Sequence, residues 1–230
     1  MLGIIAGILF VAVIVTIVIA LTRPGTASPV ATASATTPPT TAPPTATPTE
    51  TPVAPEPAAV QFTATGFILV DDTGEGIFTY AWADDAAGAV TTLTDAFGAE
   101  PTTRVEPGNG GDYPDYTVYQ WNGFMLFDMI QTAGGTPRAE YAQPSYVLIS
   151  RNEVGGIQLV AEHGLTIGTT VDAVRALSPD AEIPRGAVGA IRFVFDQARS
   201  STDGAPQYSV IADTDGSVVT AILYFRYFPA

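Results

Sequence analysis

The sequence contains no cysteine and no lysine, and its only histidine is His163. The absence of cysteine excludes disulfides, thiol catalysis, cysteine-based metal sites and lipid attachment through a cysteine. All nine basic residues are arginines, against 23 aspartates and glutamates, which gives a formal net charge of -14. Nucleic acids are bound by clustered basic side chains. We therefore expect neither nucleic acid nor nucleotide among the partners of this chain.

Recognisable catalytic patterns are also lacking. A Ser-His-Asp triad would have to use His163, but no serine lies in a Gly-x-Ser-x-Gly turn. Asp71 and Thr73 have the spacing that starts a calcium loop, yet Trp82 stands at the twelfth position, where such a loop needs glutamate. The sequence therefore predicts no enzyme activity, no metal and no cofactor.

Carboxylates are abundant enough to suggest one alternative, hydrolysis of glycosides by a pair of them. Candidate pairs can be drawn from Asp84, Asp85, Asp112 and Asp128. Among 23 acidic residues some will lie close together by chance, so this pattern is unspecific.

The N-terminal residues 1–22 form an almost wholly apolar run, with no charged side chain before Arg23. As a helix rising about 1.5 Å per residue, the run would cover about 30 Å, the thickness of the hydrocarbon core of a bilayer. Cleaved signal peptides usually have a shorter apolar region that follows a basic start. We therefore expect an uncleaved transmembrane helix and a single-pass protein of the cell membrane.

Residues 23–59 have the composition of a spacer. Between positions 24 and 58, 28 of 35 residues are proline, threonine or alanine. Such a segment has little apolar surface to bury and cannot offset the entropy lost on folding. We expect a disordered linker of a kind common in exported proteins, with the following domain on the extracytoplasmic side of the membrane.

The remaining residues contain two similar series of segments. Residues 67–70, 77–82 and 90–97 match residues 146–149, 157–161 and 171–177, with an offset that changes only from 79 to 81. This internal similarity predicts a duplication. We expect an α+β fold of two tandem strand-strand-helix-strand-strand repeats, at residues 60–135 and 136–230, in which helices pack on an antiparallel sheet. Residues 100–115 are rich in turn residues and are expected to form a loop.

The strongest local pattern is a hairpin at residues 116–130. Asn122-Gly123 supplies both positive-φ positions of a type I′ turn, which pairs Trp121 with Phe124. Both faces of this hairpin are apolar, so one covers a helix and the other is either buried or presented to a partner. One face carries Tyr119, Trp121, Phe124 and Leu126, and the opposite face carries Tyr116, Val118, Met125, Phe127 and Met129. The first of these faces is the predicted binding site, with burial between the repeats as the alternative.

Residues 168–174, Gly-Thr-Thr-Val-Asp-Ala-Val, resemble the helix start in the repeats of β-lactamase inhibitory protein and related small bacterial envelope lipoprotein domains. In that family tandem modules build a long curved sheet, whose aromatic-rich concave face grips another protein. The resemblance implies a duplicated architecture and protein binding. The first copy lacks the Gly-x-Thr start and the chain lacks the disulfides of the family, so no inhibitory residue is carried over.

The sequence thus predicts a membrane-anchored, extracytoplasmic, non-enzymatic binding module of a bacterial cell envelope. Its expected partner is an envelope protein or a glycan. Two alternatives stay open: an enzyme that acts on cell-wall polymers through carboxylates, and a structural module that self-associates through its aromatic face.

Overall fold

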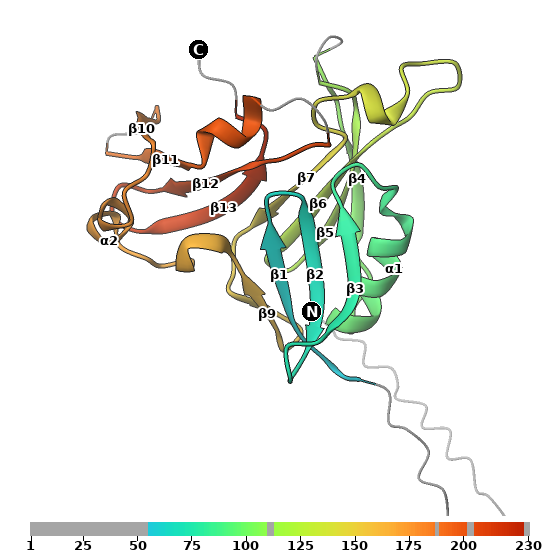
Figure 1. Cartoon of the computed structure of the whole chain (residues 1–230), viewed down its shortest axis with the longest axis horizontal. Coiled ribbons are helices and arrows are strands. Elements are labelled where there is room, and N and C mark those ends of the chain that lie inside the picture. Colours follow the sequence, from blue (N-terminus) through green and yellow to red (C-terminus); the bar gives the residue numbers. More distant parts are fainter. Residues whose placement is uncertain (1–54, 110–112, 187–188, 202–204, 228–230) are drawn as a thin grey trace, which may run out of the picture. The chain divides into compact units, whose positions relative to one another are not determined.

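The computed structural model of the chain describes residues 55–109, 113–186, 189–201 and 205–227 (Figure 1). These residues form thirteen strands in two sheets and two α-helices. The expected α+β fold is therefore wrong, because the fold is mostly β. Two segments account for much of the difference: the supposed loop contains the strand Thr102–Glu106, and the supposed linker runs into the strand Pro57–Thr63.

The small sheet has five strands in the order β3-β2-β1-β9-β8. They are β1 (Pro57–Thr63), β2 (Gly66–Asp71), β3 (Gly76–Ala81), β8 (Glu153–Val154) and β9 (Ile157–Val160). Neighbouring strands are antiparallel, except that β1 and β9 are parallel. This parallel pair joins the N-terminal strands to a segment about 100 residues further along the chain.

The large sheet has eight antiparallel strands in the order β10-β11-β12-β13-β7-β6-β5-β4. One half comprises β4 (Thr102–Glu106), β5 (Tyr116–Trp121), β6 (Phe124–Met129) and β7 (Ser145–Ile149). The other half comprises β10 (Ala181–Pro184), β11 (Ile191–Phe195), β12 (Ser209–Thr214) and β13 (Val219–Phe225). Each half is a meander of consecutive strands, and the last strands of the two meanders, β7 and β13, pair at the centre.

Each meander follows one helix, α1 (Ala86–Phe97) or α2 (Val171–Ala176), so a helix and four strands occur twice. This repetition differs from the one that the sequence predicts. Phe67, which the sequence pairs with Tyr146, lies in β2 of the small sheet, whereas Tyr146 lies in β7 of the large sheet. Short apolar segments have similar sequences whichever sheet they belong to. The nearly constant offset therefore paired segments that are not structurally equivalent.

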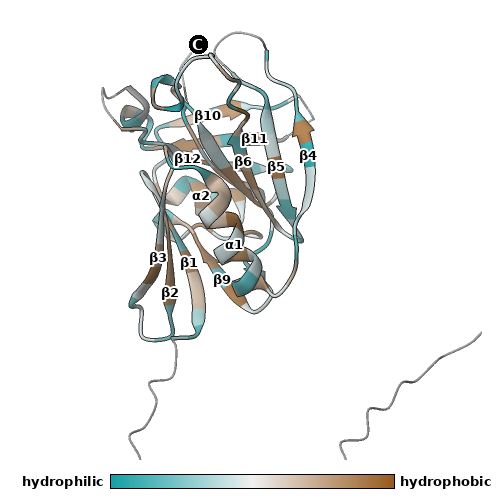
Figure 2. Ribbon diagram, turned by 90° about the vertical axis from the view of Figure 1, so that its right-hand side faces the viewer, coloured by the Kyte–Doolittle hydropathy of each residue, from teal (hydrophilic) through white to brown (hydrophobic). Residues whose placement is uncertain are grey.

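Local signals fix both ends of α1. The carboxylate of Asp85 accepts a hydrogen bond from the amide of Ala87, and Gly98 ends the helix with a left-handed φ of 65°. Leu93 and Phe97 lie on its buried stripe. Figure 2 shows α1 between the small sheet and strands β5 and β6, where the ring of Phe97 meets Trp121 edge to face at 5.5 Å. The helix thereby joins the two sheets into one core.

Three short 3-10 helices complete the described elements: η1 (Arg138–Glu140), η2 (Glu162–Gly164) and η3 (Gln197–Ser201). The hairpin of β5 and β6 has the predicted register, with Trp121 opposite Phe124. One of its faces lies in the main core, which side chains from both sheets share. The other lies on the outer face of the large sheet, in a second cluster made by Tyr116, Val118, Phe127 and Met129 with Met125, Tyr141, Tyr146 and Leu148 packed around them.

The prediction of a transmembrane helix is not met by the described part of the chain. Within those residues, no helix is both long and apolar enough to cross a membrane. The predicted anchor, residues 1–22, and most of the predicted linker lie outside the described residues. The folded part is a β-rich domain in which the apolar side chains form an ordinary core.

We expect Gly66→Ala to disrupt the pairing of β2 with β3. Gly66 pairs with Ala81, and an added Cβ would lie 1.8 Å from the carbonyl oxygen of Tyr80, which belongs to the backbone. The strands would have to separate, at a cost of more than about 3 kcal/mol. Gly88→Ala is the matched control: it lies in α1 with open space around it, and it should stabilise the fold by about 1 kcal/mol. Thermal unfolding followed by circular dichroism measures both, and equal effects would contradict the register.

Candidate functional site

The predicted aromatic face lies in the core. Trp121 is only 4% exposed, Phe124 and Leu126 are buried as well, and Tyr119 is half-buried against the same cluster. The indole nitrogen of Trp121 donates a hydrogen bond to the carbonyl oxygen of Ala99 at 2.9 Å. Three of the four predicted binding residues are therefore buried, and their placement agrees with burial, the alternative left open by the sequence.

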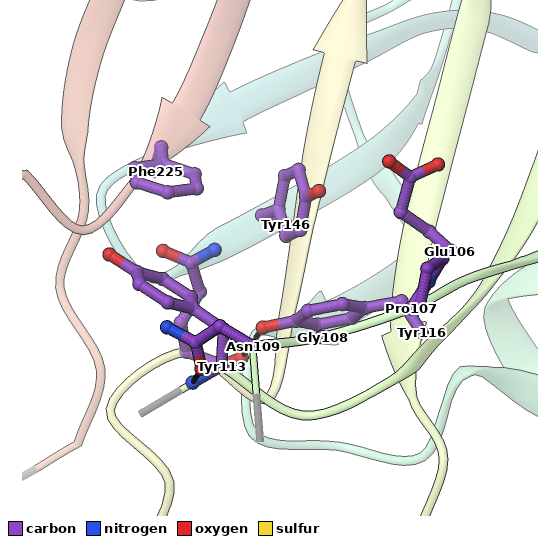
Figure 3. Close-up of a pocket in the computed structure, with 9 residues that line it drawn as sticks. Glu106, Pro107, Gly108, Asn109, Tyr113, Tyr116, Tyr146 and Phe225 are labelled. Atoms are coloured by element: carbon purple, nitrogen blue, oxygen red, sulfur yellow. Dashed lines mark hydrogen bonds between the residues drawn. The ribbon is translucent and has the colours of Figure 1, made fainter. Parts of the chain in front are cut away.

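Aromatic side chains instead surround a pocket on the outer face of the large sheet (Figure 3). This tyrosine pocket has a volume of about 310 Å³. Its aromatic residues are Tyr113, Tyr116, Tyr146 and Phe225, and its polar side chains are Glu106, Asn109 and Gln143. The volume is at the lower end of the range found for small-molecule sites, about 300–1,000 Å³.

The strand register brings these residues together. Glu106 at the end of β4 pairs with Tyr116 at the start of β5. In the centre of the sheet Tyr224 of β13 pairs with Val147 of β7, and both are buried in the main core. Side chains alternate along a strand, so the neighbouring residues Phe225 and Tyr146 point to the outer face. Their rings meet edge to face, with centroids 5.3 Å apart.

Tyr146 is the centre of the aromatic group. Its ring stacks on Phe127 at 4.1 Å and meets the ring of Tyr116 edge to face at 5.2 Å. The ring of Tyr113 stacks on Phe225 at 6.3 Å. These contacts hold the aromatic rings in fixed orientations around the pocket, a form of preorganisation that reduces the entropy lost when a ligand binds.

The ends of the loop before β5 are fixed by local contacts. The amide of Gly108 donates to the carboxylate of Asp115 at 2.8 Å, and the amide of Tyr113 donates to the side-chain oxygen of Asn109 at 3.2 Å. A Cβ on Gly108 would lie 2.2 Å from the carbonyl oxygen of Tyr113. Glycine is needed there because the two arms of the loop approach so closely.

Gln143 is the one deeply buried polar side chain of this pocket and is only 2% exposed. Its side-chain oxygen accepts a hydrogen bond from the amide of Arg226 at 3.1 Å, and its carbonyl oxygen accepts one from the hydroxyl of Tyr116 at 2.7 Å. Its side-chain nitrogen has no partner among the described residues. A buried donor without an acceptor costs about 1–3 kcal/mol, which a ligand oxygen would offset.

The hydroxyls of Tyr116 and Tyr146 remain neutral at physiological pH. Burial raises the pKa of Tyr116 and Tyr146 above the ordinary tyrosine value, and the negative charge of Glu106 raises the pKa of Tyr146 further. Neutral phenols donate hydrogen bonds and do not act as bases. Such phenols can hold a ligand through hydrogen bonds.

A second pocket of about 640 Å³ lies at the opposite ends of β5 and β6. Trp121 and Phe97 line it. Of the four predicted binding residues, Trp121 lines this second pocket and none lines the tyrosine pocket. Glu100, Arg151 and Glu153 also line it. Its aromatic residues are buried in the main core, so it presents far less aromatic surface than the tyrosine pocket.

His163 belongs to a charged network rather than to the tyrosine pocket. Its ring nitrogen lies 2.6 Å from the carboxylate of Asp196, and its ring stacks on Phe195 at 4.8 Å. Arg199 bridges Asp196 and Glu162 at 3.2 and 3.0 Å. The network joins η2 to the segment after β11, two parts of the chain more than 30 residues apart. Its contacts therefore have a structural role.

The carboxylates considered for glycoside hydrolysis also have structural partners. Asp84 accepts a hydrogen bond from the amide of Ala81, and Asp85 caps α1. Asp128 forms an ion pair with Arg138 at 2.5 Å, and burial raises its pKa. Asp112 lies outside the described residues.

The calcium-like turn at Asp71 is explained by its own hydrogen bonds. Its carboxylate accepts bonds from the side chain and amide of Thr73 and from the amide of Glu75, which lower its pKa. These donors occupy the oxygen that a metal would need. Across the described part of the chain, no three histidine, aspartate or glutamate side chains are grouped so that they could hold a metal ion.

No family model, curated protein or solved structure matches this chain. Sequence reasoning missed Tyr113, Gln143 and Phe225, which come from three distant segments. The sequence feature that could have indicated this pocket is the second apolar face of the β5–β6 hairpin. Tyr116 belongs to that face and also lines the pocket.

Proposed function

We propose that this chain is a non-enzymatic, extracytoplasmic binding module of a bacterial cell envelope, and that it captures an envelope protein or glycan in the tyrosine pocket. One observation carries the proposal: the partly exposed rings of Tyr113, Tyr146 and Phe225 line a pocket next to a buried amide donor that lacks a partner. Aromatic rings supply large contact areas at low entropic cost, and such residues dominate the energetics of binding sites. The location at the cell membrane and the extracytoplasmic side is proposed on the sequence of residues 1–59 alone.

The proposal is tested with the full chain and isolated bacterial cell envelopes. Sedimentation of the chain with sacculi and with solubilised envelope proteins gives its affinity for each. Tyr113→Ala should weaken binding about tenfold, because Tyr113 is a partly exposed ring whose loss leaves the core intact. Glu153→Gln, in the second pocket, is the control and should leave binding unchanged.

Two results would count against this function. Binding that Tyr113→Ala leaves intact would place the site elsewhere, and no binding to either fraction would remove the basis for a binding module. Release of soluble fragments from sacculi would instead support the alternative of an enzyme that acts on wall polymers. Self-association through the predicted aromatic face is disfavoured, because Trp121, Phe124 and Leu126 are buried within a single chain.

A further inference from the structure

The polar groups of the tyrosine pocket restrict the chemistry of its ligand; this inference rests on the function proposed above. The side-chain nitrogen of Gln143 is a donor that needs an acceptor, and the side-chain oxygen of the same amide is already bonded to the amide of Arg226. The polar atom of this amide that lacks a partner is therefore a donor. A matching ligand carries an oxygen that accepts a hydrogen bond at this position.

Glu106, in contrast, requires a ligand group that donates a hydrogen bond. Its carboxylate lies at the exposed rim of the pocket and only accepts hydrogen bonds. The guanidinium of Arg104 lies 3.4 Å from this carboxylate, and both side chains are about half exposed. The positive charge of Arg104 thus offsets part of the negative charge of Glu106, which solvent still reaches. A ligand that donates hydrogen bonds satisfies this carboxylate, while an anionic ligand is disfavoured by it and by the net charge of -14.

The aromatic walls add a third requirement, a flat apolar face that can lie against a ring. Quaternary ammoniums, proline-rich peptides and sugars are three ligand classes that bind aromatic walls. A quaternary ammonium is attracted to aromatic rings, but it has no acceptor for Gln143, and Arg104 weakens the attraction of Glu106 for a cation. A proline-rich peptide offers rings and carbonyl acceptors, but proline has no N–H to donate to Glu106.

A sugar ring meets all three requirements. Its C–H face packs on aromatic rings, and each of its hydroxyl groups both donates and accepts a hydrogen bond. We propose that the tyrosine pocket binds a ring of a neutral saccharide, which lies against Tyr113, Tyr146 and Phe225, accepts a hydrogen bond from Gln143 and donates one to Glu106. The pocket thus makes the chain a glycan-binding module.

Isothermal titration calorimetry of the full chain tests this ligand class. The saccharide probes are maltohexaose, cellohexaose and the hexamer of N-acetylglucosamine, and the competing probes are a proline decapeptide and tetramethylammonium. At least one saccharide should bind with a dissociation constant of about 1 mM or lower. Glu106→Gln keeps the shape of the side chain and should weaken that binding about tenfold, as expected for a hydrogen bond to a charged group. Tyr113→Ala should weaken it by a similar factor.

The control variant Glu153→Gln removes an exposed carboxylate from the second pocket and should leave saccharide binding unchanged. Binding of the proline decapeptide or of tetramethylammonium, without any saccharide, would overturn the assignment and leave a binding pocket of another specificity. Saccharide binding that Glu106→Gln and Tyr113→Ala do not affect would also overturn it. If no saccharide binds while Tyr113→Ala still weakens binding to cell envelopes, the glycan assignment fails and the proposed binding function stands.

Discussion

Trp121→Ala should destabilise the fold by about 3–5 kcal/mol, as truncation of a buried aromatic side chain does. Trp121 is enclosed by Phe97 and Phe124 at ring distances of 5.5 and 5.9 Å, and its indole nitrogen bonds to the carbonyl oxygen of Ala99. The variant would leave a cavity where α1 meets β5 and would leave that carbonyl without its donor. Chemical denaturation of the full chain, followed by circular dichroism, measures the loss.

Val105→Ala is the matched control for that measurement. Val105 lies in β4 of the same sheet and is 62% exposed, so its truncation should change the stability by less than about 0.5 kcal/mol. If Trp121→Ala were as mild as this control and abolished partner binding instead, Trp121 would be a surface residue and not part of the core. The same variant should leave the tyrosine pocket functional wherever the protein remains folded.

The two faces of the β5–β6 hairpin show which features of the fold could be predicted from the sequence and which could not. The pairing of Trp121 with Phe124 across Asn122-Gly123 is confirmed. The predicted type I′ turn is wrong, because Gly123 has a positive φ of 117° and Asn122 does not. The same residues specify which side chains share a face. They do not specify which face meets α1, because both faces are apolar and the choice depends on contacts with distant elements.

The fold class was wrong for a related reason. The ends of α1 are set by Asp85 and Gly98, which act within one helix. The sheets depend on non-local pairs, such as β1 with β9, whose partners are about 100 residues apart. The tyrosine pocket is still less predictable, since Tyr113, Gln143 and Phe225 meet only after four strands are in register.

The link between the two sheets depends on a buried hydrogen-bond network around Trp82. Its indole nitrogen donates to the carbonyl oxygen of Ala64 at 2.8 Å, and its carbonyl oxygen accepts from the hydroxyl of Ser145 at 2.7 Å. The hydroxyl of Tyr208 donates to the carbonyl oxygen of Ser145 at 2.6 Å, and its ring stacks on the indole of Trp82 at 5.2 Å. The turn after β3 is thereby bonded to β7 and to the segment before β12.

Trp82→Ala should therefore cost about 5 kcal/mol, at the upper end for a buried aromatic residue, because it opens a cavity and also removes the stacking partner of Tyr208 and a donor to Ala64. Trp82→Phe keeps a ring in place and should cost markedly less. Because both sheets share one core cluster, the wild-type chain should unfold in a single transition, with far-UV and near-UV circular dichroism changing together. Separate transitions, with only the earlier one moved by Trp82→Ala, would mean that the small sheet folds independently of the large one and that Trp82 does not join them.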